Sequence, residues 1–228
     1  WRVIIWGTAI QLLFALFVFK VPAGIKAFSF VNDVVVKLLD SASAGTKFVF
    51  GNLADVKVSG PIIAFQVFPA IVFFSALVSI LYYWGVMQVI IRGFAWVFTK
   101  LMRISGAESL CAAANIFVGI ESSLTIRPFL AKMTHSELCV VLVAGMATVA
   151  SSVLALYVGF LKDQFPNIAG HLVSASLLGA PAALVMSKII FPETEKPETL
   201  GVNVECRFER EKTLFEAIIN GANAGVQL

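Results

Sequence analysis

The stretch NIFVGIESSLTIRP, residues 115–128, sets Asn115, Glu121 and Arg127 in a very apolar neighbourhood. An ionisable side chain at membrane depth is costly, and it marks a binding site or an ion pathway by default. We therefore expect Glu121 to contact a substrate or an ion. The structural alternative is an internal pair with Arg127, which lies six positions further along, across a glycine and serine tip. Alternatively, Arg127 lies near the cytoplasmic interface of the membrane, where its side chain is paired or reaches toward water.

The segment ATVASS, residues 147–152, is the second place where side chains could do chemistry. It sets Thr148, Ser151 and Ser152 among small residues, halfway along an apolar segment. If the helix unwinds there, the Thr148 hydroxyl and nearby carbonyls become free ligands. Together with Asn115 they would form an oxygen-only shell, which suits a hard cation such as sodium and not zinc. The alternative is ordinary, because small and hydroxyl residues also let membrane helices pack closely.

Composition places these residues in a membrane protein. The chain has 228 residues, 59% of them hydrophobic and 14% charged, and its mean hydropathy is +0.90. Soluble domains are about 45–50% apolar and about 25% charged. A net charge of +3 without a basic cluster speaks against a nucleic-acid partner. Cys111, Cys139 and Cys206 show no zinc or redox spacing, and no cofactor is expected. Because the chain begins at Trp1 and ends without a tail, we expect a piece of a longer protein.

Four segments are long and apolar enough to cross a membrane, which takes roughly 20 residues. They are Val3–Phe19, Pro61–Tyr83, Cys139–Leu161 and Ile168–Phe191. Two further segments, residues 23–50 and 86–103, are amphipathic and are predicted to lie at the membrane surface.

Positive charge predicts the orientation. Arg92, Lys100 and Arg103 follow the second span with no acid among them, which places that end in the cytoplasm. The lysines of residues 26–57 would then lie outside. They alternate with aspartates in a long segment, and long segments obey this rule poorly.

Residues 108–131 predict a re-entrant hairpin. Its two apolar arms, residues 110–118 and 124–131, each reach roughly 14 Å, about half of a 30 Å hydrocarbon core. The polar tip GIESS lies between them. Such a tip is tolerated at membrane depth only where it is buried in protein or lines a wet cavity, and transporters bind substrates and ions at broken helices of this kind.

Three capping boxes mark helix starts, because in each a hydroxyl residue precedes a glutamate by three positions. They are Ser105 with Glu108, Thr134 with Glu137, and Thr213 with Glu216. We therefore interpret Glu108, Glu137 and His135 as helix-start residues and not as a catalytic or metal cluster.

Several stretches together resemble the concentrative nucleoside transporter family over nearly the whole chain. They are FQVFPAIVFFSALVSILYYWGVMQ, SGAESLCAAANIFVGIESSLTIRPFLAKMTHSEL, AGMATVASSVLALYVGF, GAPAALVMSKIIFPETEKPET and AIINGANAGVQL. The resemblance implies a trimeric, ion-coupled nucleoside importer, not an enzyme, that is a multi-pass protein of the cell (plasma or inner) membrane. It implies sodium-coupled symport by alternating access.

The implied fold is an all-α polytopic membrane protein with transmembrane helices, interfacial amphipathic helices and a re-entrant helical hairpin. It is built from inverted repeats, of which this chain carries the first. The implied division is scaffold helices with a surface helix in 1–85, an interfacial helix in 86–103, a transport-domain part in 104–191, and a polar loop with the start of the next helix in 192–228. The transport-domain part comprises the hairpin 104–131, a broken helix 136–161 and the helix 168–191.

The resemblance also implies ligands. The sodium site would use the Asn115 side chain, the Val118 carbonyl, the Thr148 hydroxyl and the Val149 carbonyl. Glu121 matches the tip glutamate that binds the nucleobase side of the substrate, and the matching apolar contact to the base is Val153.

The chain departs from the family at two places. The tip is one residue shorter than usual, and Ile120 replaces a glutamine that reads the base, so Ser122 instead of Glu121 is the alternative base contact. The second hairpin and last helices, which hold the ribose, are absent from this sequence.

Three rival interpretations stay open. One is a proton-coupled nucleoside transporter of the same fold with Glu121 as the proton carrier, and another is a non-transporting structural subunit. The third is an intramembrane enzyme. The sequence places no paired carboxylates, Ser-His pair or metal-binding constellation at membrane depth that would support it. The sequence does not determine whether purine or pyrimidine nucleosides are preferred.

Overall fold

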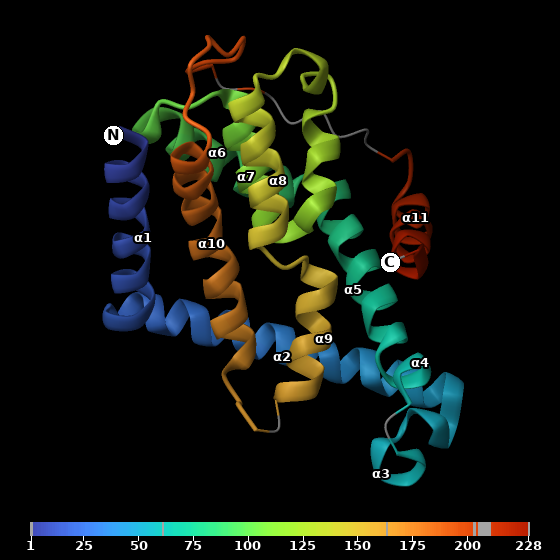
Figure 1. Cartoon of the computed structure of the whole chain (residues 1–228). Helices are drawn as coiled ribbons and strands as arrows, with labels where there is room; N and C mark the ends of the chain where they lie inside the picture. Colours follow the sequence, from blue (N-terminus) through green and yellow to red (C-terminus); the bar gives the residue numbers. More distant parts are fainter. Residues whose placement is uncertain (1, 61, 163, 203, 205–210, 228) are drawn as a thin grey trace. The chain divides into compact units, whose positions relative to one another are not determined.

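The structure, a computed structural model, describes residues 2–60, 62–162, 164–202, 204 and 211–227. Those residues are mostly helical, and the only β-pairing among them is a single bridge between Ser105 and Leu200. The elements, in chain order and drawn in Figure 1, are α1 (Arg2–Lys20), α2 (Pro22–Phe50), η1 (Gly51–Ala54), α3 (Val56–Ser59), α4 (Ile63–Gln66), α5 (Phe68–Tyr83), α6 (Val86–Met102), α7 (Gly106–Val118), η2 (Gly119–Ile126), η3 (Leu130–Lys132), α8 (His135–Ala147), α9 (Ser151–Leu161), α10 (Ile168–Ile190) and α11 (Leu214–Gln227).

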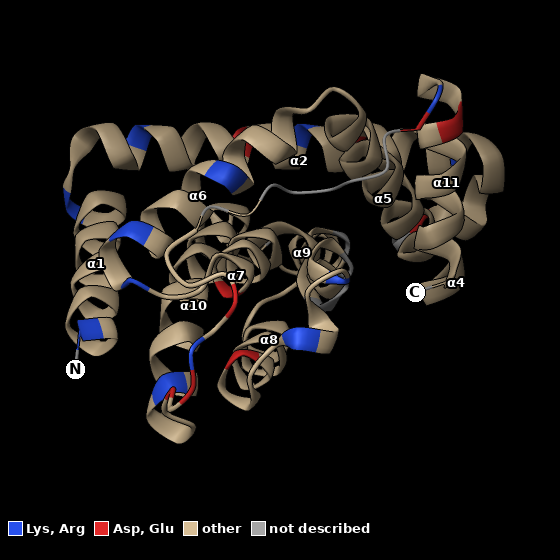
Figure 2. Ribbon diagram, turned by 90° about the horizontal axis from the view of Figure 1, so that it is seen from above, with Lys and Arg blue, Asp and Glu red and all other residues tan. Residues whose placement is uncertain are grey.

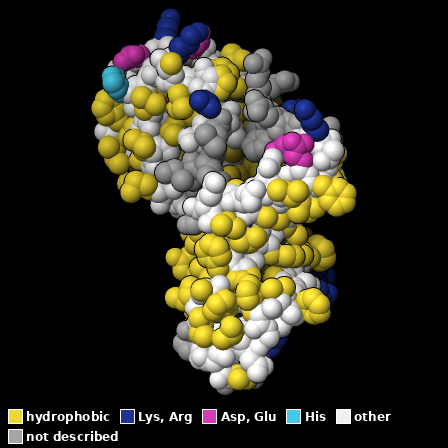
Figure 3. Space-filling model, turned by 90° about the vertical axis from the view of Figure 1, so that its right-hand side faces the viewer, with side chains coloured by type: hydrophobic (Ala, Val, Ile, Leu, Met, Phe, Trp, Pro, Cys, Tyr) yellow, Lys and Arg dark blue, Asp and Glu magenta, His cyan; other side chains and the backbone are white. Residues whose placement is uncertain are grey.

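Three stretches of helix are long and apolar enough to cross a membrane, among the residues described: Arg2–Lys20, Ile63–Tyr83 and Ile168–Ile190. They agree with three of the four predicted spans. Figure 2 shows that α5 carries no charged position and that α1 carries charge only at its ends. Hydrophobic side chains cover much of the surface in Figure 3, as expected for helices that face lipid. The predicted all-α membrane fold is therefore confirmed.

The chain divides into two compact units. The first comprises residues 1–25, 85–150 and 174–209, and the second comprises residues 26–84, 151–173 and 210–228. The division into scaffold and transport parts stays a prediction.

The first unit is built around α7. Every residue of α7 from Gly106 to Ile116 is buried, which is typical of a helix that packs on all sides. The amphipathic helix α6 packs against it and buries the positions that recur at helical spacing: Met87, Ile91, Ala95, Phe98 and Met102. Thus α6 has one face in the core, and its predicted place at a membrane surface stays a prediction.

In the second unit, α11 packs closely against α5. Gly221 and Gly225 lie four positions apart on one face of α11. A Cβ on Gly221 would come within 2.7 Å of the Ser79 Cβ, and a Cβ on Gly225 within 2.9 Å of the Ser75 Cβ. Small residues at this spacing let two membrane helices approach backbone to backbone.

The helix predicted over residues 23–50 is present as α2, and its place at the membrane surface stays a prediction. Asn32 on α2 is buried. Its side chain donates a hydrogen bond to the Pro166 carbonyl (3.2 Å) and accepts one from the Gly170 N–H (3.3 Å). Lys162 forms an ion pair with Asp40 at 2.7 Å. These contacts fix α2 to the turn after α9.

Candidate functional site

The polar residues of the first unit gather at two places along α7. The first is its N-terminus, where the predicted capping box is complete. The Ser105 N–H donates to Glu108 Oε2 (3.1 Å), and the Glu108 N–H donates to Ser105 Oγ (3.4 Å). The Ser105 and Thr199 hydroxyls are 2.8 Å apart. The capping box thus begins α7, and Thr199, in the loop after α10, packs against its N-terminus.

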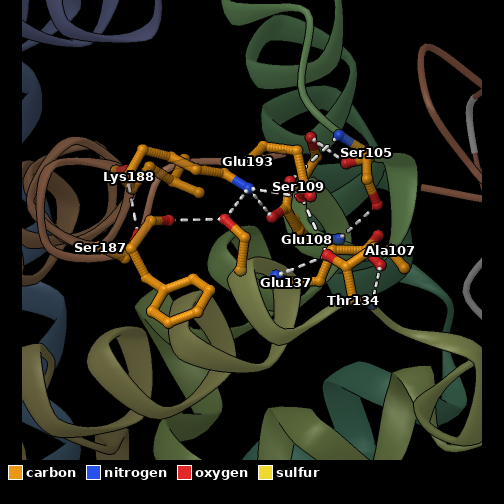
Figure 4. Close-up of polar contacts among 12 residues, drawn as sticks. Ser105, Ala107, Glu108, Ser109, Thr134, Glu137, Ser187, Lys188 and Glu193 are labelled. Atoms are coloured by element: carbon orange, nitrogen blue, oxygen red, sulfur yellow. Dashed lines mark hydrogen bonds and ion pairs between the residues drawn. The ribbon is translucent and has the colours of Figure 1, made fainter. Parts of the chain in front are cut away.

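Lys188, near the end of α10, is the centre of this polar cluster (Figure 4). Its ammonium forms an ion pair with Glu108, donates to Ser136 Oγ (2.9 Å) and contacts Glu193 Oε2 (3.3 Å). The side chains of Lys188 and Glu108 are 9% and 1% exposed. Burial raises the pKa of the Glu108 carboxyl, and the Lys188 ammonium opposes that rise. The pair is therefore buried in the protein interior.

The second capping box, at the start of α8, belongs to the same cluster. The Thr134 N–H donates to Glu137 Oε2 (2.8 Å), and the Glu137 N–H donates to Thr134 Oγ1 (3.2 Å). Thr134 Oγ1 also donates to Glu193 Oε2 (2.9 Å). The interpretation of Glu108 and Glu137 as helix-start residues is confirmed. Lys188 was not predicted as part of a site, although a single lysine in an apolar segment of membrane-spanning length is a signal for one.

The second polar place is the other end of α7. The helix stops at Val118, and Gly119 has φ 72°, where an L side chain is strained. A Cβ on Gly119 would also lie 2.9 Å from the Ala150 Cβ. The chain therefore turns at a position that requires glycine, against the backbone of the segment after α8.

The returning arm differs from the prediction. The α-helix expected over residues 124–131 is instead the 3₁₀ segment η2, followed by a turn and the short η3. Two causes are local: Pro128 lacks the N–H that an α-helix needs at that position, and the Thr125 hydroxyl donates to the Ser122 carbonyl (2.6 Å). The helix–turn–helix expectation was therefore wrong for the second arm, while the interruption at residue 119 is as predicted.

Among the tip residues, Ser122 is buried, and its hydroxyl lies 3.5 Å from Cys111 Sγ on α7. Arg127 is exposed. The side chains of Ile120 and Glu121 lie outside the described residues, so their roles stay predictions. Val153 lies in α9, in the second unit.

The predicted break after α8 is present. The helix ends at Ala147, Thr148 is extended (φ −125°, ψ 156°), and α9 begins at Ser151, so the span predicted over residues 139–161 is two short helices. Thr148 Oγ1 lies 3.0 Å from the Asn115 carbonyl and 3.2 Å from the Ala144 carbonyl. The break thus faces the end of α7, as predicted.

Asn115 is the exception among these polar residues. It is 0% exposed. Its side-chain Oδ1 and Nδ2 have no hydrogen-bond partner within the part of the chain that the structure describes. Buried polar groups are almost always partnered, and each exception calls for an explanation such as an ion.

The four residues predicted to bind sodium offer neutral oxygen atoms. Asn115 Oδ1 and Thr148 Oγ1 are neutral oxygens, Val118 is the last residue of α7, and Val149 lies in the break between α8 and α9. The last carbonyls of a helix lack intrahelical partners. Among the described residues, no group of three or more His, Cys, Asp or Glu could hold a metal, and neutral oxygens suit a hard cation.

Comparison with known proteins gives matches along most of the chain. Residues 1–53 match the family described as "Na+ dependent nucleoside transporter N-terminus". Residues 64–164 match "Nucleoside recognition", and residues 171–228 match "Na+ dependent nucleoside transporter C-terminus".

The relatives include an "Uncharacterized transporter" of Haemophilus influenzae, 42% identical over 100% of this chain and 54% of its own length. They also include "Sodium/nucleoside cotransporter 1" of Rattus norvegicus, 40% identical over 100% of this chain and 34% of its own length. A solved structure of CNTnw in an inward-facing substrate-bound state has TM-score 0.89 and 35% identity, with 99% of this chain and 55% of that chain covered. The chain thus spans between a third and about half of these relatives.

Proposed function

Because this chain belongs to the sodium-dependent nucleoside transporter family, we propose that it is part of a sodium-coupled nucleoside importer. The observation that carries the proposal is the buried, unpartnered Asn115 side chain beside the helix break at Thr148. In a transporter, broken helices hold coupling ions and substrates near the middle of the membrane. The protein would work by alternating access as a homotrimer in the cell membrane.

The sodium site comprises the Asn115 side chain, the Thr148 hydroxyl, and the carbonyls of Val118 and Val149. Sodium supplies the favourable charge that the unpartnered Asn115 Oδ1 otherwise lacks in a dry interior. The close approach of Gly119 to Ala150 supports the proposal, because it brings the end of α7 next to the break. A displacement of the backbone at Gly119 or Ala150 would separate the proposed sodium ligands on α7 from those in the break.

The nucleobase half of the substrate site comprises Glu121, Ile120 and Val153, with Ser122 as the alternative to Glu121. A carboxylate can accept hydrogen bonds from base N–H groups, and an apolar Val side chain can pack on the base. The burial of Ser122 against Cys111 favours Glu121 over Ser122 as the base contact. The ribose half belongs to parts of the relatives that this chain does not span.

Thr148→Val tests the sodium site. In the full-length protein in sealed vesicles, uptake of labelled uridine and adenosine should need several-fold more sodium, because the change removes one ligand oxygen and leaves the shape. Thr46→Val is the matched control, because the Thr46 hydroxyl also bonds the carbonyl four residues back (2.8 Å) in a buried helix position. An unchanged sodium dependence in Thr148→Val would exclude the site. Nucleoside uptake that depends on pH in the absence of sodium would favour the proton-coupled alternative.

Glu121→Ala tests the substrate site. Leaving the base donors unpaired should weaken nucleoside binding by roughly 5- to 150-fold, about 1–3 kcal/mol. Glu121→Gln keeps one acceptor and should bind better than Glu121→Ala. Binding is measured on the full-length protein beside Ser122→Ala. If only Ser122→Ala loses affinity, the base is read by Ser122; if neither does, it is read elsewhere.

A further inference from the structure

A basic hollow lies in the first unit, beside the polar cluster at the N-terminus of α7. It has a volume of about 800 Å³, and its charged lining residues are Arg2, Lys100 and Arg103. No aspartate or glutamate lines it within the part of the chain that the structure describes. Figure 2 shows Lys and Arg positions on α1 and α6 and no acidic position on either helix. Three cations therefore face one open space without a counter-charge in its lining.

Two described acids lie beside the hollow. Glu108 and Glu193 line a neighbouring cavity of about 270 Å³, which shares Arg103 and Leu200 with the basic hollow. Both carboxylates are ion-paired with Lys188. Lys188 offsets one of these two negative charges, so at most one of them is left against the three cations of the hollow.

Arg103 occupies a backbone conformation that favours glycine. It caps the C-terminus of α6 with φ 54° and ψ 45°, and it is the only non-glycine residue with positive φ among those described. Glycine is the usual residue at such a cap because it has no Cβ. The sequence therefore keeps an arginine where the fold alone would favour glycine, and the guanidinium lines the hollow.

The remaining lining is amphipathic. Lys100 Nζ lies 4.8 Å from the centroid of the Trp96 ring, a cation–π contact. Trp96 and Leu200 are exposed, and tryptophan is enriched where a membrane meets water. A ligand that fits this lining has an anionic group for the cations and apolar chains for Trp96 and Leu200.

From these observations we propose that the hollow binds the phosphate group of an anionic phospholipid. The absence of acids after the second span predicts that this end of the molecule is cytoplasmic, and the cytoplasmic leaflet carries the anionic lipids. Basic pockets between helices on that side bind such headgroups. The lipid would fix the end of α6 against the start of α1. This site is independent of the proposed nucleoside and sodium sites.

The test uses the full-length protein in neutral detergent, without sodium or nucleoside. Native mass spectrometry measures retained phosphatidylglycerol and, separately, phosphatidylcholine. The wild type should retain phosphatidylglycerol selectively. Lys100→Gln should lower its retention about fivefold, the effect of one cation near a membrane surface. Arg92→Gln is the matched control, because it removes the same charge from the same helix outside the hollow.

Arg103→Gly separates lipid binding from folding. Glycine accepts the conformation of residue 103, so the melting temperature in lipid-free detergent should stay or rise, while phosphatidylglycerol retention should fall about fivefold. Lys100→Arg keeps the charge and should retain the lipid. Equal retention of both lipids, or an equal loss in Arg92→Gln, would overturn the proposal. Displacement of phosphatidylglycerol by an equal concentration of inorganic phosphate would assign the hollow to free phosphate instead.

Discussion

The two ends of α7 treat buried polar groups in opposite ways. At its N-terminus, Ser105 and Glu108 are buried and partnered through a capping box and an ion pair with Lys188. About two turns beyond Glu108, Asn115 is equally buried, but its side-chain atoms have no partner among the described residues. Both ends lie on the same helix in the same apolar surroundings, so burial alone does not explain the difference.

The difference separates a structural role from a binding role. A buried polar group that is fully hydrogen-bonded fixes the elements that supply its partners. One left without a partner costs about 1–3 kcal/mol, and a ligand can recover that free energy. We therefore expect the N-terminal end to determine stability and the C-terminal end to determine ion binding. Three substitutions test that expectation.

Lys188→Met has the largest expected effect. It leaves the Glu108 carboxylate buried without its cation, which costs about 3–5 kcal/mol of unfolding free energy. The measurement is thermal or denaturant unfolding of the full-length protein in detergent. Lys132→Met is the matched control, because Lys132 also pairs with a glutamate (Glu198, 2.9 Å) but both side chains are more than half exposed. That control should cost no more than about 1 kcal/mol. Equal losses in the two variants would contradict a special role for the buried pair.

Asn115→Leu should move stability in the opposite direction. Leucine has a similar size and no polar atoms, so unfolding without sodium should cost up to about 1–3 kcal/mol more than in the wild type. Added sodium should then no longer raise the melting temperature. A variant that is destabilised and still stabilised by sodium would show that Asn115 has a structural role and that the ion binds elsewhere.

Ser105→Ala has the smallest expected effect. It removes the N-cap hydroxyl of α7, which typically contributes about 1 kcal/mol to stability. Because Ser105 lies at the other end of the helix, the sodium concentration for half-maximal uptake should not change. A shift as large as that of Thr148→Val would mean that the two ends of α7 are coupled and that their separation into two roles is wrong.

Much of the fold could be predicted from the sequence, because its signals are local. Span length and apolar composition predicted α1, the α4–α5 segment and α10. Two capping boxes predicted the starts of α7 and α8, because a hydroxyl and a carboxylate three residues apart suffice for that geometry. The small and hydroxyl residues of ATVASS predicted the break at Thr148. The second arm of the hairpin was missed, although the two causes of its 3₁₀ conformation, Pro128 and the Thr125 hydrogen bond, are local as well.

By itself, the sequence determined where helices begin, break and end, since those events depend on neighbours a few residues apart. Only the tertiary structure decided which polar groups meet. It paired Glu108 with Lys188, 80 positions away, and brought Thr148 to the Asn115 carbonyl, 33 positions away. It also left the Asn115 side chain without a described partner. Packing alone decides such contacts, because a side chain in an apolar segment can face lipid, a neighbouring helix or an ion with the same local sequence around it.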